Sequence, residues 1–447
     1  MSRFAGGWLA AHRFFDPAGL SILSHVFFPA SRLWAAAEAG GMDRDAFYRS
    51  VPMLPHLEDR SRLGRALAIA GHAREAAKAA DERWEDVLFA QGGSSEVARA
   101  AAEAARKHAR HAYNMTRQHF ARLSLRHVPR LKHETRSPHE VALRFGHLLA
   151  DPAPIFARPA SEPRIERSGD FAYAEGRDYF VRFQSPSRPP GDMVTARVHE
   201  PSGAVDPPTI IYGHGICVEF DHWNGLIDET PELIRRGYRV IRPEAPWHGR
   251  RRPEGYYGGE RVLATFPEGA LDALSAAVTE WSVLASFARA TSKGPLVFGG
   301  VSLGAMTAQL AAERSQDWPA ELRPDVLYLV THCGSIADAI FSGAIPKLFG
   351  GLDEAIDIGW SHEEAARYLA ITDPKRRLPL SSRHIVSVLG RRDVVTPFAS
   401  GQALVERWCL PSDNVFILDR GHFSVPMSLV RDHRPINRLT DIVRSHR

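Results

Sequence analysis

The feature that most constrains this chain is the pentapeptide Gly-Val-Ser-Leu-Gly at 300–304, which fits the pattern G-x-S-x-G. An apolar run at 296–298 precedes it and predicts a strand, and a helical pattern begins near Ala305. A serine on such a sharp turn from strand to helix has strained backbone angles, and glycine fits two residues before and after it, where side chains would clash. The helix that begins behind the serine also favours negative charge. In this setting the pattern predicts that Ser302 is a nucleophile.

Short apolar runs alternate with helical patterns through most of the second half of the chain. Apolar strands buried between helices form mostly parallel sheets with helices on both faces, so the pattern predicts an α/β fold. After an antiparallel pair at 179–183 and 194–198, the expected strands are 209–212, 238–241, 296–298, 326–330, 385–389 and 415–418. The alternation stops at 333–380, which we interpret as a helical lid insertion over the C-terminal edge of the sheet.

The first 150 residues show helical patterns and few strand signals. A chain of 447 residues is long for a single core, so two domains are expected. We expect an α-helical N-terminal or cap domain at 1–150, a linker at 151–177 that begins with a proline-rich stretch, and a catalytic domain at 178–447. The clearest helix is 94–126, with Ser95 as its N-cap. Its predicted apolar face consists of Val97, Ala101, Ala104, Ala105, Ala112 and Met115.

A serine hydroxyl is a weak nucleophile until a base removes its proton. His422 follows the last predicted strand, a place from which a side chain can return to the sheet edge that carries Ser302. The base in turn needs a carboxylate to orient it. Asp393 lies in the loop after strand 385–389, and Asp338, after the preceding strand, competes for that role. The chain order serine, aspartate, histidine is the order expected for this fold.

The negative charge that develops on an attacked carbonyl oxygen needs two backbone N–H donors. We expect one donor from Leu303, directly after the nucleophile. The other is expected from the glycine-rich loop 213–217, where small residues let the main chain approach a substrate, and Ile216 is the preferred residue.

The loop that follows strand 238–241 would lie at the same edge of the sheet. It contains Trp247, His248 and Arg250, and together with His214 these residues are the candidates for substrate binding. The guanidinium of Arg250 suits an acidic substrate group, which it would bind in bidentate fashion. A charged loop of this kind is, however, more often simply solvated.

From about Tyr179 onward, the chain resembles the α/β-hydrolase superfamily. The resemblance rests on the His214-Gly215 loop, the Ser302 turn, residues 390–393 with Pro397, Gly421-His422, and the loop 246–251, which is similar to that of an esterase-like branch. It implies hydrolysis of a carboxylic ester, thioester or amide through an acyl-enzyme on Ser302, without cofactor or metal. Some hydrolases that this chain resembles also place a helical domain before the core, where it helps to roof the active site.

Several other classes of protein are disfavoured by patterns that the sequence lacks. It has no P-loop pattern, no H-E-x-x-H and no paired Cys-x-x-Cys, so neither a nucleotide site nor a zinc site is expected. The net charge of +4 is small for this length and does not favour a nucleic-acid partner. The three cysteines do not suggest a disulfide framework.

A cytoplasmic protein is expected because the N-terminus is a poor signal peptide and no run approaches about 18 uninterrupted apolar residues, so no membrane span is expected. The expected partner is a small-molecule acyl substrate, and a homodimer is left open.

Other functions remain open for the same set of residues. Acyl transfer to an alcohol or amine, and hydrolysis of a C–C bond, would use the same triad, because the lid and the pocket choose the acceptor. A binding protein that kept the fold without turnover is a further alternative. The intact set of serine, aspartate and histidine counts against that last hypothesis.

Overall fold

The computed structural model describes residues 15–51, 60–90, 93–123, 128–173, 176–217, 229–349 and 352–446. Its centre is a 10-stranded sheet with the order β1-β3-β4-β6-β5-β7-β8-β9-β10, in which β2 also pairs with β3. The strands are β1 (Glu166–Arg167), β2 (Phe171–Tyr173), β3 (Gly176–Gln184), β4 (Met193–Pro201), β5 (Thr209–Gly213), β6 (Arg239–Pro243), β7 (Leu296–Val301), β8 (Val326–Val330), β9 (Ile385–Gly390) and β10 (Val415–Leu418).

The sheet combines an antiparallel part with a longer parallel part. Strand β4 runs antiparallel to both β3 and β6, whereas β6, β5, β7, β8, β9 and β10 are parallel neighbours. Because parallel strands end at the same edge, the loops after β5, β7, β9 and β10 come together there. This mixed sheet, with helices between its parallel strands, confirms the predicted α/β-hydrolase fold.

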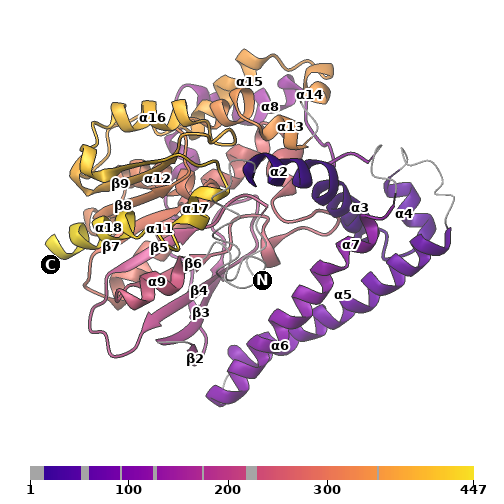
Figure 1. Cartoon of the computed structure of the whole chain (residues 1–447), viewed down its shortest axis with the longest axis horizontal. Helices are drawn as coiled ribbons and strands as arrows, with labels where there is room; N and C mark the ends of the chain where they lie inside the picture. The colour runs from indigo at the N-terminus through magenta and orange to yellow at the C-terminus, as the bar shows by residue number, and fades with distance from the viewer. Residues whose placement is uncertain are drawn as a thin grey trace.

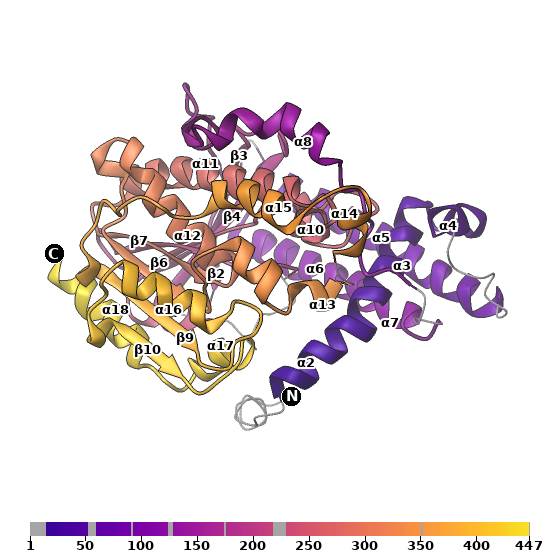
Figure 2. The ribbon, with the colours of Figure 1, turned by 90° about the horizontal axis from the view of Figure 1, so that it is seen from above.

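Helices cover both faces of the sheet (Figure 2). Helices α11 (Glu268–Thr291) and α12 (Leu303–Arg314) pack on one face, and α9 (Thr230–Arg235), α17 (Ser424–Ser428) and α18 (Arg434–Ser445) pack on the other. Each face of the sheet has its own apolar core. Successive side chains of β5 point to opposite faces, so Ile211 packs in the core with α11 and α12, and Ile210 packs in the core with α9, α17 and α18. Within the described residues, no helix has both the length and the hydropathy that crossing a membrane requires.

The helices of the N-terminal part are α2 (Phe15–Ile22), α3 (Phe28–Ala39), α4 (Arg44–Ser50), α5 (Arg60–Leu88), α6 (Glu96–Met115), α7 (Arg117–Phe120) and α8 (Pro138–Phe145), with a π-helix, Leu23–Phe27, between α2 and α3. The later helices are α9 (Thr230–Arg235), α10 (Glu260–Ala264), α11 (Glu268–Thr291), α12 (Leu303–Arg314), α13 (Ile345–Phe349), α14 (Asp353–Asp357), α15 (His362–Leu369), α16 (Phe398–Arg407), α17 (Ser424–Ser428) and α18 (Arg434–Ser445).

The N-terminal helices share an apolar core, which includes the buried Trp34, with Tyr257, Leu348, Phe349 and Val395 from later in the chain. Figure 1 shows α5 and α6 as a long pair of helices beside the sheet. Two ion pairs attach α3 to the segment between β6 and α11: Arg32 lies 2.5 Å from Glu260, and Glu38 pairs with Arg252. All four side chains are at least nine-tenths buried, so the loss of Arg32 would leave the buried Glu260 carboxylate without its cationic partner.

The helix expected at 94–126 is present as α6 and α7, which end at Phe120, and Ser95 caps α6 as predicted. Residues 124–126 lie outside the described residues. The hydroxyl of Ser95 accepts a hydrogen bond from the N–H of Ala98 at 3.2 Å. The prediction of which face would be buried is wrong. All residues of the predicted apolar face are exposed, and Val97 is 80% exposed.

The buried face of α6 consists largely of polar side chains that are paired with one another. Glu103 accepts a hydrogen bond from Arg106 at 2.9 Å and also lies 3.2 Å from Arg197 of β4. The guanidinium of Arg106 also lies over the ring of Trp84 on α5. A hydropathy pattern cannot predict this face because paired charges and aromatic contacts, rather than apolar side chains, attach the helix to the sheet.

Secondary structure occurs where the sequence suggested a linker. Within 151–177, β1 and β2 pair with β3, and Phe156 is buried in the apolar core that contains α11 and α12. Val141 and Phe145 of α8 belong to the same core, although they precede the expected linker. The insertion expected at 333–380 contains α13, α14 and α15 between β8 and β9.

Two backbone segments touch where the end of β5 meets the start of α12. A Cβ atom on Gly304 would overlap the backbone of Gly213, and one on Gly300 would lie 2.5 Å from the carbonyl carbon of Gly304. Only glycine at these positions lets the two segments approach so closely. The contact therefore fixes the loop after β5 against the turn after β7.

Replacing Gly304 with alanine should lower the free energy of unfolding by about 3 kcal/mol or more, because the new methyl group has no space. A matched control is Gly64→Ala in α5, where a Cβ atom meets nothing within 4 Å. That change should instead stabilise the protein by about 0.5–1 kcal/mol, since alanine is the better helix former. Urea unfolding of both variants measures the difference, and equal effects would contradict this packing.

Candidate active site

Ser302 lies on the turn between β7 and α12, with φ of 56° and ψ of −119°. These angles are strained for a residue with a side chain. The N–H of Ser302 donates to the carbonyl oxygen of Val330 on β8 at 2.9 Å, which holds the turn against the neighbouring strand. The predicted nucleophile turn is thus present in geometry, with its hydroxyl at the C-terminal edge of the sheet.

The side chains of Ser302, His422 and Asp393 form one hydrogen-bonded chain. The Nε2 atom of His422 lies 3.1 Å from the Oγ of Ser302, and its Nδ1 atom lies 2.8 Å from the Oδ2 of Asp393. The three residues come from the loops after β7, β10 and β9, and each is less than 9% exposed. This arrangement can pass a proton from the serine hydroxyl to an imidazole that a carboxylate orients.

The carboxylate of Asp393 is itself held by its own loop. Its Oδ1 atom accepts hydrogen bonds from the N–H groups of Val395 at 2.8 Å and Thr396 at 2.9 Å, and its Oδ2 atom accepts one from the Thr396 hydroxyl. The competing carboxylate, Asp338, instead accepts a hydrogen bond from the hydroxyl of Ser400. The geometry therefore favours Asp393 as the partner of His422.

Two histidines hold the loop 213–217 through hydrogen bonds with backbone groups. The Nε2 atom of His214 accepts from the N–H of Ala245 at 3.1 Å, and that of His248 accepts from the N–H of Cys217 at 3.1 Å. Each ring therefore carries its proton on Nδ1, which lies within 2.9 Å of a backbone carbonyl oxygen. Both rings are used to shape the loop, and their centres are 5.0 Å apart.

Trp247 and Arg250, which were expected to bind substrate, pack against other side chains of the protein. Trp247 is buried in a small apolar cluster with Val262, and the guanidinium of Arg250 lies 4.1 Å from the ring centre of Trp84. Trp247, His248 and Arg250 are not among the residues that line the cavity beside Ser302, whereas His214 is.

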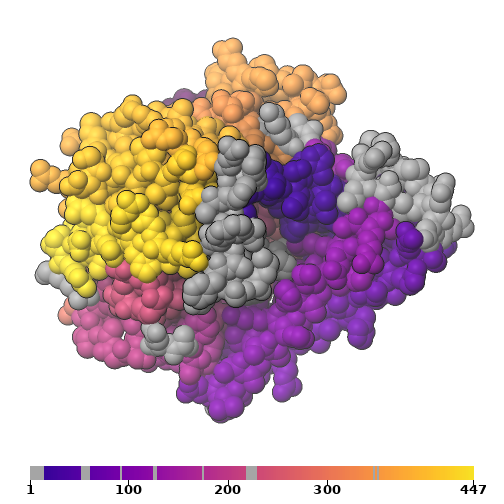
Figure 3. All heavy atoms as spheres, in the orientation of Figure 1, coloured from indigo at the N-terminus to yellow at the C-terminus, as the bar shows by residue number. Residues whose placement is uncertain are grey.

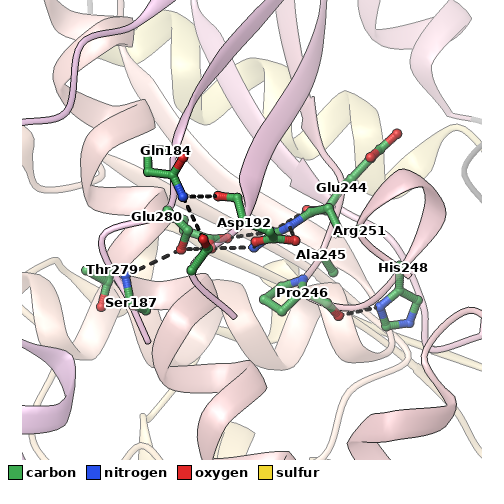
Figure 4. A network of polar contacts seen from close by, with 12 residues as sticks. Gln184, Ser187, Asp192, Glu244, Ala245, Pro246, His248, Arg251, Thr279 and Glu280 are labelled. Atoms are coloured by element: carbon green, nitrogen blue, oxygen red, sulfur yellow. Dashed lines mark hydrogen bonds and ion pairs between the residues drawn. The ribbon is translucent and has the colours of Figure 1, made fainter. Parts of the chain in front are cut away.

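The loop after β6 is anchored by a buried network around Arg251 (Figure 4). The guanidinium donates to Asp192 at 2.8 Å, to Glu280 at 2.6 Å and to the carbonyl oxygen of Glu244 at 2.9 Å. Burial disfavours the charged form, but Glu280 and Asp192 outweigh it and raise the pKa of Arg251. The network joins the β3–β4 turn, α11 and the segment that carries His248.

A cavity of about 300 Å³ opens beside Ser302 and His422. Its walls are largely apolar and come from the N-terminal part, the insertion after β8, and the ends of several strands with the loops that follow them. The apolar residues that line it are Leu23, Phe27, Phe28, Ile216, Val301, Ile345, Leu348, Phe349, Val395, Phe423 and Pro426. Among the described residues, no group of three or more His, Cys, Asp or Glu side chains is arranged to hold a metal ion.

The N-terminal part and the insertion after β8 meet over this cavity. The rings of Phe28 from α3 and Phe349 from α13 lie 4.4 Å apart, and Phe27 from the π-helix also lines the space. Figure 3 shows the indigo N-terminal segment between the orange insertion and the purple helices. No motif in the sequence singled out these residues, because they come together only in the tertiary structure.

No family model matches the chain, and no curated protein matches its sequence. Among solved structures, it is similar to acetyl xylan esterase 1 from Thermoanaerobacterium sp., with 14% sequence identity, a TM-score of 0.48, and coverage of 70% of this chain and 96% of that chain. It is also similar to an esterase from Pyrobaculum calidifontis, with 14% identity, a TM-score of 0.39, and coverage of 69% and 92%. A third similar structure is a cold-adapted esterase from an Arctic intertidal metagenomic library. It has 14% sequence identity and a TM-score of 0.40, and the match covers 62% of this chain and 96% of that chain.

His332, directly after β8, makes the stability of this region sensitive to pH. The ring is 1% exposed and lies 2.8 Å from the Ser387 hydroxyl, and burial lowers its pKa to about 4. An unfolded chain binds a proton at this histidine below pH of about 6.5, whereas the folded protein does so only below its own lower pKa. The contribution of His332 to stability is therefore present above the unfolded pKa and is lost as the pH falls.

Between pH 7 and pH 4.5, the wild-type protein should lose about 2 kcal/mol more of its unfolding free energy than a His332→Gln variant, which has no such group to protonate. Urea unfolding at the two pH values measures this difference. An identical loss in both proteins would show that His332 does not carry the effect.

Proposed function

We propose that this protein is a serine hydrolase that cleaves carboxylic esters with an apolar acyl group through an acyl-enzyme on Ser302. The observation that carries the proposal is the hydrogen-bonded chain from Ser302 through His422 to Asp393 at the wall of an apolar cavity. A nucleophile, a base and an orienting acid are in reach of one another, and the space beside them suits a hydrocarbon group.

In the first half of the proposed reaction, the Oγ of Ser302 bonds to the ester carbonyl carbon while His422 takes the hydroxyl proton. The carbonyl oxygen becomes negative and accepts hydrogen bonds from the backbone N–H groups of Leu303 and Ile216. Leu303 is the first residue of α12, so its N–H is not needed for the helix, and Ile216 lines the same cavity as Ser302.

In the second half, the C–O bond to the alcohol breaks, and His422 gives its proton to the leaving oxygen. Water then loses a proton to His422 and attacks the acyl carbon. The bond from this carbon to the Oγ of Ser302 breaks, His422 returns the proton to Oγ, and the carboxylic acid leaves. Asp393 orients the imidazole and stabilises its charge throughout.

Replacing Ser302 with alanine should lower kcat for chromogenic acyl esters by more than about 10⁴-fold, because the acyl-enzyme can no longer form. A serine-reactive phosphonate should label the wild-type protein at Ser302 and leave the variant unlabelled. Full activity in Ser302→Ala would disprove the mechanism. An unlabelled wild-type protein without turnover would instead favour a binding protein.

Asp393→Asn should lower kcat by about 10⁴-fold, since the imidazole would lose the partner that sets its tautomer. The matched control is Asp338→Asn, which makes the same chemical change, carboxylate to amide, at the other candidate residue. That variant should keep nearly the activity of the wild-type protein. If the two variants exchanged their effects, the assignment of the acid would be wrong.

The walls of the cavity should set the length of the acyl group. Phe27→Ala enlarges the cavity and should raise the ratio of kcat/KM for decanoate over butyrate esters by about 10-fold, within the range that a few methylene contacts provide. Val26→Ala, on the same π-helix but at an exposed residue, should leave the ratio unchanged. Equal ratios in all three proteins would show that the acyl group binds elsewhere.

A further inference from the structure

The carboxylate of Asp16 contacts the segment that carries His422, although more than 400 residues separate them. One carboxylate oxygen accepts hydrogen bonds from the N–H groups of Phe423 at 2.6 Å and Ser424 at 3.3 Å. The other oxygen accepts one from the hydroxyl of Ser424. Asp16 thus satisfies N–H groups at the start of α17, directly after the candidate base.

The segment around His422 is shaped to receive this carboxylate. A Cβ atom on Gly421 would lie 2.5 Å from the Cγ of Asp16, so only glycine leaves room for the contact. The N–H of Gly421 donates to the hydroxyl of Ser424 at 3.0 Å, the same hydroxyl that donates to Asp16. The residues on both sides of His422 are therefore tied to one carboxylate from α2.

The same N-terminal segment also forms a wall of the cavity. Helix α2 continues into the π-helix, whose residues Leu23 and Phe27 line the space beside Ser302. Figures 1 and 2 both show α2 close to α17. Gly19 of α2 faces the ring of Phe423, which lines the cavity as well.

We propose that Asp16 is a positioning residue: by joining α2 to the segment 421–424, it keeps His422 aligned with Ser302. The inference rests on the proposed function, because it concerns the alignment of a catalytic base. A shift of the His422 backbone would lengthen the 3.1 Å contact with Ser302 and slow proton transfer.

The kinetic test compares Asp16→Ala, Asp16→Asn and a control on the same helix, Ser21→Ala, at an exposed residue. Phosphonate titration first counts the competent sites, so that loss of folded protein is not mistaken for slow turnover. Per titrated site, Asp16→Ala should lower kcat for a short ester by about 10- to 100-fold, with little change in KM. Asn keeps one acceptor oxygen and should restore part of the rate, and Ser21→Ala should match the wild-type protein.

A second measurement does not depend on turnover. In Asp16→Ala, hydrogen exchange at the amides of Phe423 and Ser424 should become faster, because the acceptor of both groups is gone. Unchanged exchange would overturn the proposal whether or not the protein is a hydrolase. Faster exchange with wild-type kcat per titrated site would also overturn it, because the contact would then be structural only. Failure of the proposed function shows separately, as absent labelling and turnover in the wild-type protein.

Discussion

The backbone contact between Gly213 and Gly304 is the constraint on which the site depends. It places the end of β5 directly against the turn after β7, so the loop 213–217 and Ser302 have one fixed relation. Any side chain at either glycine would separate them, and N–H groups from the two segments could then not converge on one oxygen. Hydrogen bonds from the N–H of Ala245 to His214, and from the N–H of Cys217 to His248, hold the remainder of that loop.

The parts of the site that sequence alone predicted are those set by local order. The Ser302 turn needs only a strand, two glycines and a helix that are adjacent in the chain, and parallel strands bring the loops with Asp393 and His422 to the same edge. The choice between Asp393 and Asp338 required coordinates, because both follow strands of the same sheet. In the structure, Asp393 lies 2.8 Å from His422, whereas Asp338 accepts a hydrogen bond from Ser400.

The parts that sequence did not predict depend on pairs of residues far apart in the chain. The buried face of α6 uses Glu103 and Arg106, whose charges are tolerated because Arg197 of β4 completes the network. Likewise, Trp247 and Arg250 have residue types common in binding sites, but they pack against other parts of the protein. Composition and periodicity describe each segment by itself and do not contain these partners.

The contacts that attach the N-terminal helices determine which elements bound the cavity. Buried ion pairs such as Arg32 with Glu260 contribute little net stability, but the loss of one partner alone is strongly destabilising. They hold α3 where Phe28 meets Phe349, and Asp16 holds α2 beside His422. Ser302, His422 and Asp393 lie in loops at the edge of the sheet, whereas much of the apolar cavity beside them is bounded by helices outside it. Under the proposed function, substitutions in those helices would change which acyl groups are accepted while the triad keeps its alignment, provided that the Asp16 contact is kept.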